Sequence, residues 1–217
     1  MQKKILGLSL SLAVPVIFTL FINPVFIKLN INEPVSTLIG FGVFWGLAFV
    51  MLFFTQTVEN QPLATIGWKS LSWKSGLIAV GLGVLLSLLV PVLTLLISKV
   101  FPPSNSGTVA QVASNYSWWI LLLSVLTAGI TEEILFRGYP LERLQKITGN
   151  KWISGLISLV FFVAVHATGW NLAHIVGVVV PLGIILTGLY FWQRNLLFVM
   201  IVHVVIDLPL VFIALLS

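Results

Sequence analysis

A chain of 217 residues in which 59% are hydrophobic and 8% are charged cannot cover its apolar content with polar surface, so the composition excludes a water-soluble fold. The formal charge of +5 comes from eleven basic residues that lie mostly at the ends of apolar runs, which indicates membrane orientation and not nucleic-acid binding. The sequence has no cysteine, which excludes thiol nucleophiles, disulfide bonds and thiolate metal sites.

Apolar segments follow one another along the chain, each close to the roughly 20 residues that a helix needs to cross a hydrocarbon core of about 30 Å. Helices satisfy their own backbone hydrogen bonds in lipid, and the long continuous runs do not fit the alternating pattern of a barrel strand. The sequence therefore predicts an all-α fold in which residues 1–217 form a single membrane domain, a polytopic transmembrane bundle of about seven helices with eight as the upper count. The segments are 5–27, 35–55, 75–101, 118–139, 152–168 (the shortest), 172–192 and 196–216.

Basic residues predict the orientation of these segments. The apolar stretch after Lys3 and Lys4 is long for a signal peptide, so we expect a retained first helix. With the N-terminus in the cytoplasm, eight basic residues lie inside and only Lys28 and Lys99 outside, as the positive-inside rule requires. We therefore expect an integral protein of a prokaryotic plasma membrane. The eight inner residues are Lys3, Lys4, Lys69, Lys74, Arg143, Lys146, Lys151 and Arg194.

Two connections are long enough to interpret. Residues 56–74 contain tryptophan and lysine, which are typical of the headgroup boundary, so we expect an inner loop with an interfacial amphipathic piece. Residues 102–117 begin with two prolines followed by Ser, Asn and Gly, which predicts a flexible outer loop. No internal repeat is apparent, which disfavours an inverted-repeat transporter but leaves that class open.

Ionisable side chains within the apolar segments are concentrated in the C-terminal half. A charged side chain at the centre of a membrane helix costs about 2.5–3.5 kcal/mol, so several are tolerated only where they face a shared protein-lined or watery interior. They should converge, either as a polar network that joins helices or as a functional site, and their position inside the membrane favours the second. The residues are Glu132, Glu133, Arg137, His166, His174, His203 and Asp207.

The spacing of these residues predicts how they pair. Glu133 and Arg137 are four residues apart, so they share a helix face and can form an ion pair. Glu132 lies about 100° round the same helix, away from that partner, and is the better candidate for a general base. His203 and Asp207 are also four apart, so the carboxylate can orient the imidazole.

Depth in the membrane follows from the predicted turns. If the chain turns at 149–150, Glu133 and His166 lie equally far from the turn, and an antiparallel hairpin places them at the same level. The stretch 138–151 then extends past the bilayer on the cytoplasmic side. His203 lies roughly 13 Å above the next inner turn, at a compatible depth. We expect the pocket to open toward the cytoplasm.

The residue inventory limits how such a site could cut a peptide bond. The chain has a single aspartate, Asp207, so an aspartyl dyad is impossible. It has no HExxH zinc-protease helix and no GxSxG serine motif. A system of glutamates and histidines remains.

Three short motifs resemble those of one family. Residues 132–138 fit the signature EExxxR, residues 162–166 fit FxxxH, and His203 is followed four residues later by Asp207. With these motifs the chain resembles the CPBP family (CAAX protease and bacteriocin-processing, or Abi) of intramembrane proteases, which includes the type II CAAX prenyl endopeptidases. The resemblance covers about residues 118–210, which we take as the catalytic core.

The resemblance implies roles for the site residues. It implies hydrolysis by a water molecule activated by Glu132 and His166, with His203 and Asp207 stabilising the oxyanion. An ionised aspartate only accepts hydrogen bonds, so Asp207 more reasonably orients His203. Glu133 and Arg137 complete the implied catalytic set. His174 matches no motif, and we expect an interfacial or packing role for it.

Metal dependence stays open at this point. The family name metalloprotease implies zinc, which Glu132, His166 and His203 could hold, but the same residues could activate water directly. Expected partners are membrane lipid and a peptide or prenylated peptide, with no nucleic acid. The alternatives of another class are a non-proteolytic bacteriocin-immunity or scaffold protein and a proton-coupled transporter; the complete motif set argues against the first, and the asymmetric placement of the charges argues against the second.

Overall fold

Helices make up all the regular structure of the described residues in the computed structural model, which describes residues 1–101 and 107–216. Six of them are long and apolar enough to cross a membrane: Gln2–Phe26, Glu33–Val58, Trp73–Ile97, Trp118–Thr148, Leu172–Gln193 and Leu196–Leu216. A seventh apolar helix, Lys151–His166, is shorter. All seven predicted segments are thus helical, and the prediction of a polytopic transmembrane helix bundle is confirmed.

Several of these long helices contain segments of π-type spacing, in which an N–H bonds the carbonyl five residues back. Such turns widen the helix and change which side chains share a face. The elements in chain order are α1 (Gln2–Leu8), η1 (Ser9–Ala13), α2 (Val14–Ile17), η2 (Phe18–Ile22), α3 (Asn23–Lys28), α4 (Glu33–Phe53), η3 (Phe54–Val58), η4 (Leu63–Ile66), α5 (Trp73–Ile97), α6 (Val109–Asn115), α7 (Trp118–Thr127), η5 (Ala128–Gly138), α8 (Tyr139–Thr148), α9 (Lys151–His166), α10 (Leu172–His174), η6 (Ile175–Val179), α11 (Val180–Gln193) and α12 (Leu196–Leu216).

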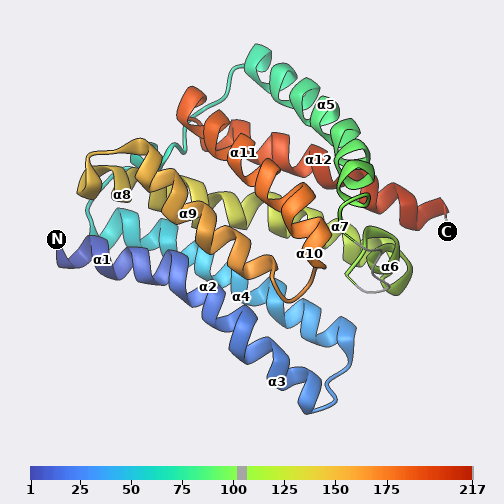
Figure 1. Ribbon diagram of the computed structural model, residues 1–217. Helices are drawn as coiled ribbons and strands as arrows, with labels where there is room; N and C mark the ends of the chain where they lie inside the picture. The colour runs from blue at the N-terminus through green and yellow to red at the C-terminus, as the bar shows by residue number, and fades with distance from the viewer. Residues whose placement is uncertain (102–106, 217) are drawn as a thin grey trace.

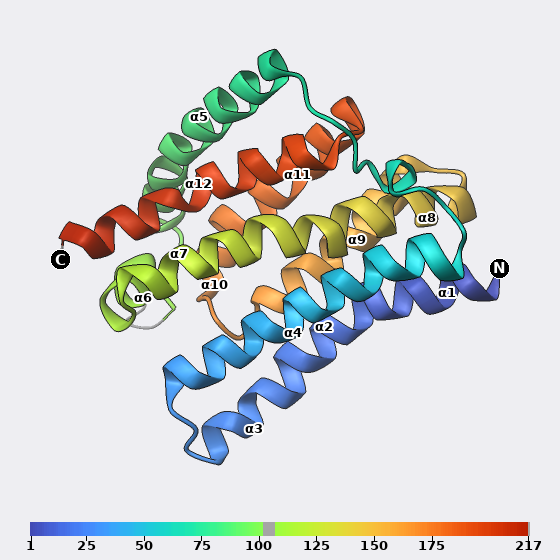
Figure 2. The same cartoon turned by 180° about the vertical axis from the view of Figure 1, so that it is seen from behind.

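The helix formed by α7, η5 and α8 lies inside the bundle. Its middle part, η5, contacts α4, α9, α12 and η1. The first rod, α1 to α3, runs beside α4, and α5 lies at the opposite edge against α12 (Figures 1 and 2). Because η5 has protein on several sides, it is the part of the chain where charged side chains can be kept away from lipid.

The central helix ends in the predicted hairpin. Gly149 ends α8 with φ of +68°, a left-handed conformation that favours glycine. The Asn150 side chain then accepts hydrogen bonds from the N–H groups of Trp152 and Ile153 at the start of α9. A helix of 31 residues is about 46 Å long, so the end of Trp118–Thr148 extends beyond a hydrocarbon core of about 30 Å.

The two long connections are more ordered than their composition predicts. The prediction of a flexible loop over 102–117 is wrong for its second half, where α6 forms and the Thr108 side chain accepts a hydrogen bond from the N–H of Gln111. Residues 102–106 lie outside the described residues. In the inner connection, η4 is a single 3-10 turn that buries Ile66 completely.

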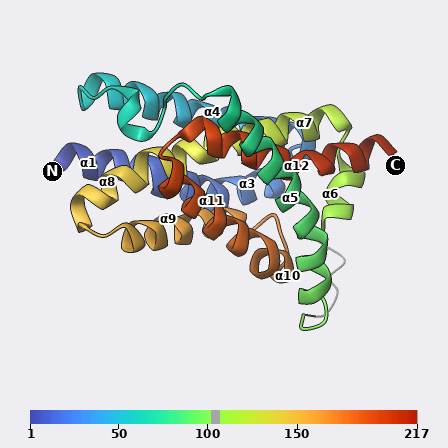
Figure 3. The same cartoon turned by 90° about the horizontal axis from the view of Figure 1, so that it is seen from above.

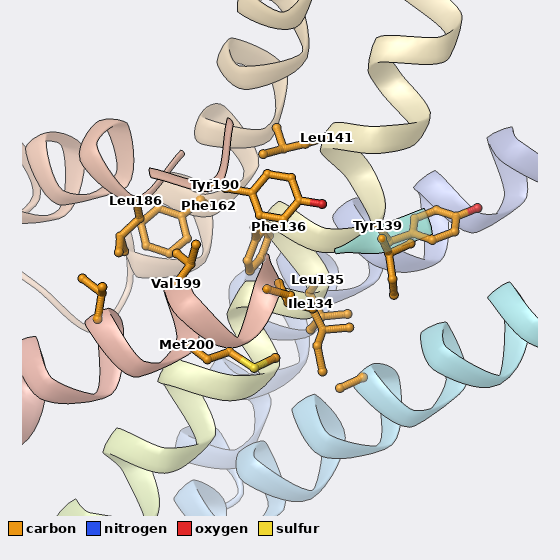
Figure 4. Packing of buried hydrophobic residues seen from close by; sticks show 14 of the residues in the cluster. Ile134, Leu135, Phe136, Tyr139, Leu141, Phe162, Leu186, Tyr190, Val199 and Met200 are labelled. Atoms are coloured by element: carbon orange, nitrogen blue, oxygen red, sulfur yellow. The ribbon is translucent and has the colours of Figure 1, made fainter. Parts of the chain in front are cut away.

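The tightest packing surrounds the central helix (Figure 4). Leu135, Phe136 and Tyr139 are fully buried, and Phe162 of α9 meets Phe136 edge to face at 5.7 Å between ring centroids. In contrast, α5 exposes large apolar side chains along its length, including Leu85 and Leu88. The exposed side chains of α5 are therefore suited to face lipid, whereas the side chains of the central helix face other parts of the protein.

Candidate active site

Glu133 and Arg137 form a buried ion pair on η5. Arg137 Nη1 donates to Glu133 Oε1 at 2.8 Å, and the two side chains are 1% and 0% exposed. The predicted pairing is thus confirmed. Breaking such a pair would leave a buried charge uncompensated, so the two residues hold each other in place.

His203 of α12 joins this pair, a contact that the sequence did not predict. Its Nδ1 lies 2.7 Å from Glu133 Oε1, the same oxygen that accepts from Arg137. Its Nε2 faces Asp207 Oδ2 at the longer distance of 3.4 Å, in the predicted four-residue pairing. Only an imidazolium carries an N–H on both nitrogens, so this arrangement favours a charged His203 between two carboxylates.

Glu132 lies beside the ion pair but is not part of it. The residue is 8% exposed, and its Oε2 has no hydrogen-bond partner among the described residues. The nearest basic nitrogen is His166 Nε2 of α9, at 4.0 Å from Oε2. The structure therefore separates the two neighbouring glutamates as predicted: Glu133 is neutralised by partners, and Glu132 is left facing an imidazole across a gap.

His166 is oriented by its own helix. Its Nδ1 lies 2.8 Å from the carbonyl oxygen of Phe162, and a carbonyl can only accept, so Nδ1 carries the proton of the neutral ring. That tautomer leaves Nε2 as an acceptor directed toward Glu132. The hairpin thus brings His166 to the level of the paired glutamates, as the turn at 149–150 predicted.

An aromatic ring separates the two halves of the site. The guanidinium carbon of Arg137 lies 4.0 Å from the centroid of the Phe162 ring, and the His166 ring lies 4.6 Å from the same centroid. Phe162 therefore contacts both a cation and an imidazole, which adds cation–π attraction to the arginine and an apolar wall to the histidine. The contact of this ring with Arg137 was not predicted from the sequence.

His174 occupies a different position. Its ring stacks on Trp170 with 4.1 Å between centroids and 18° between planes, and its backbone N–H donates to the Asn171 side chain at 2.8 Å. These contacts agree with the packing interpretation of this histidine. None of the four ion pairs described for the site includes it.

The residues expected to hold zinc do not form a ready ligand set. His203 has both ring nitrogens directed at carboxylates, so it could bind a metal only by giving up Glu133 or Asp207. Within residues 1–101 and 107–216, no group of three His, Asp or Glu side chains is placed to hold a metal ion. Glu132 and His166 alone are fewer protein ligands than the three of a catalytic zinc site, so the donors present do not fit that group.

Comparison with known proteins gives one match. Residues 114–209 match the family described as type II CAAX prenyl endopeptidase Rce1-like, and this stretch contains all six of the predicted catalytic residues. No curated protein and no solved structure matches the chain. Over residues 114–209, the chain is thus similar to the Rce1-like type II CAAX prenyl endopeptidases.

Proposed function

We propose that this protein is an intramembrane endopeptidase that hydrolyses a peptide bond in or near the membrane with water activated by Glu132 and His166. The observation that carries the proposal is the pair itself: a buried carboxylate oxygen without a partner among the described residues, 4.0 Å from a histidine nitrogen that can accept a proton. A separation of this size lets one water molecule contact both groups. A polar network that only joins helices has no need of such an open pair.

In the proposed reaction, Glu132 takes a proton from the water while His166 Nε2 accepts the second hydrogen bond. The oxygen attacks the peptide carbonyl carbon, and the carbonyl oxygen becomes an oxyanion. When the C–N bond breaks, the proton held by Glu132 passes to the leaving amine. The second proton of the water also passes to the amine, so one water molecule is consumed and a carboxylate and a protonated amine are formed.

His203 is the proposed donor to the oxyanion. Its Nδ1 is held tightly by Glu133 at 2.7 Å, whereas the longer 3.4 Å contact of Nε2 with Asp207 leaves that N–H better able to turn to a new acceptor. In this scheme Asp207 orients the imidazolium, while Glu133 and Arg137 fix its position. A fixed donor needs little reorganisation when negative charge develops.

The same geometry supports a reaction without metal, since the zinc donor set is incomplete and the glutamate–histidine pair can polarise water directly. The expected substrate is a peptide or a prenylated peptide. We propose that the site opens toward the cytoplasm, because the basic residues predict that side for the N-terminus. The open Glu132–His166 pair also disfavours a non-proteolytic immunity or scaffold role.

The proposal is tested by cleavage of a prenylated CaaX reporter and of a peptide library by the protein purified in detergent. Glu132→Ala and His166→Ala should abolish cleavage, and a chelator should leave it unchanged. Glu33→Gln is the matched control outside the site and should cleave at the wild-type rate. Cleavage that survives Glu132→Ala and His166→Ala would refute the site, and cleavage lost with the chelator and restored by zinc would refute the metal-free mechanism.

A further inference from the structure

Pro140 interrupts the backbone hydrogen bonds of the central helix just after the site. Because proline has no N–H, it cannot donate to the carbonyl of Leu135 in π-type spacing or to that of Phe136 in α-type spacing. The N–H of Tyr139 donates to the Ile134 carbonyl, so the π-type spacing persists to the start of α8. The chain thus lacks a backbone donor next to two completely buried residues, where an unpaired carbonyl is costly.

Two serines from other helices supply donors at these carbonyls. Ser11 Oγ of η1 donates to the carbonyl oxygen of Leu135, and Ser158 Oγ of α9 donates to that of Phe136. The two serines are 0% and 1% exposed, so neither has water as an alternative partner. A buried hydroxyl in this bundle can instead bond within its own helix, as Thr55 Oγ1 does with the Met51 carbonyl at 2.8 Å.

The bond from Ser158 links the two helices that carry the proposed water-activating pair. Ser158 lies on α9 two helical turns before His166, and Phe136 lies one turn after Glu132 on η5. A hydrogen bond between these helices therefore limits their relative sliding and rotation close to the 4.0 Å gap. Ser11 fixes the same turn from the first helix, which lies outside the stretch that matches the family.

We propose that Ser11 replaces the backbone donor missing at Pro140, that Ser158 supplies a donor to the neighbouring Phe136 carbonyl, and that both are positioning residues that hold Glu132 in place relative to His166. The inference rests on the proposed peptidase function for its catalytic part. Its hydrogen-bonding part does not, because the serine bonds and the missing N–H exist whatever reaction the site performs.

The kinetic test is a double-substitution cycle with Pro140→Ala, which restores a backbone N–H. Ser158→Ala and Ser11→Ala should each lower kcat about tenfold with little change in KM, because each leaves a buried carbonyl short of a donor and disturbs the register of the site. In the presence of Pro140→Ala, whose N–H reaches the Leu135 carbonyl in the π-type spacing, Ser11→Ala should lower kcat by less than about threefold, whereas Ser158→Ala should keep its loss. Matched controls are Thr55→Val, which removes a buried hydroxyl bonded within its own helix, and Ser9→Ala on the exposed side of η1.

The same single and double substitutions can be compared without any substrate by measuring the thermal midpoint of unfolding in detergent. Each serine substitution should lower the midpoint by about 2–6 °C, and Pro140→Ala should remove most of the loss caused by Ser11→Ala but not that caused by Ser158→Ala. Losses from Ser11→Ala that are equal with and without Pro140→Ala, in both kcat and midpoint, would overturn the inference. If the substitutions are coupled in their effect on the midpoint but leave kcat unaffected, the positioning role is overturned. If they are coupled in the midpoint and the protein cleaves no substrate, the peptidase function is refuted, while the replacement of the missing donor remains supported.

Discussion

Glu133 contacts two basic side chains of the site, one on its own helix and one on α12. One of its oxygens meets both Arg137 of the same helix and His203 of α12, while its Oε2 has no partner among the described residues. A carboxylate that neutralises two cations in an apolar interior keeps both where the chemistry needs them. Glu132, one residue earlier, takes no part in this ion pairing.

Arg137→Ala is expected to lower the free energy of unfolding by about 3–5 kcal/mol, because the carboxylates of Glu133 and Asp207 would then share a single cation, His203. Arg194→Ala is the matched control: this arginine also pairs with a glutamate, Glu142 at 2.5 Å, but its side chain is 37% exposed. Loss of that pair should cost about 1 kcal/mol or less. Unfolding in detergent would measure both, and equal losses would contradict the burial argument.

The predictability of the site depends on which contacts are local. Pairs four residues apart, Glu133 with Arg137 and His203 with Asp207, follow from helix geometry alone and were predicted. The depth of His166 in the membrane, level with Glu133, was predicted from the single turn at 149–150. The contact between Glu133 and His203 could not be predicted, because it depends on how α12 packs on η5 across 70 residues of sequence.

At the scale of elements, close helix approach depends on a few glycines. A Cβ at Gly83 of α5 would lie 2.6 Å from the Val205 side chain and 3.0 Å from the Val202 carbonyl oxygen of α12. Two residues earlier, a Cβ at Gly81 would meet nothing within 4 Å. The same helix therefore offers one glycine required by packing and one that is not.

Gly83→Ala is expected to destabilise the protein by about 1–3 kcal/mol, because the added methyl group must push α5 away from α12. Gly81→Ala should leave stability unchanged or raise it by up to about 1 kcal/mol, since alanine favours the helix and has free space. Thermal unfolding of the two variants side by side would measure the difference. A Gly81→Ala variant that loses as much as Gly83→Ala would show that space at the helix contact is not the cause.

The elements themselves were predictable where hydropathy is decisive. All seven apolar segments are helices, because only helices satisfy the backbone in lipid. Hydropathy carries no information about π-type spacing, so the wide turns of η5 went unpredicted. Composition also failed for α6, where the capping by Thr108 outweighs the polar and flexible character of the surrounding residues.

At the scale of the whole molecule, the two termini lie at opposite ends of the bundle (Figure 3). Seven helices running back and forth require this, because an odd number of crossings leaves the ends on different sides. The short helix α9 therefore counts as a crossing in the topology, although it has only 16 residues. Which end faces the cytoplasm is predicted by the basic residues.

Cysteine labelling can test this orientation directly, because the chain contains no cysteine of its own. Lys146→Cys, at the end of α8, should react with a membrane-impermeant maleimide only after permeabilisation of the cells. Ser114→Cys, exposed near the end of α6, should react in intact cells. The reverse pattern would place the site on the outer side.

We propose that Glu132 activates water and does not itself attack the peptide. A single turnover in H₂¹⁸O, with enzyme in excess over a cleavable peptide, distinguishes these two roles. Direct attack by water predicts one solvent oxygen in the new product carboxylate from the first turnover. A first-turnover product without label, its oxygen supplied by the enzyme, would contradict the account.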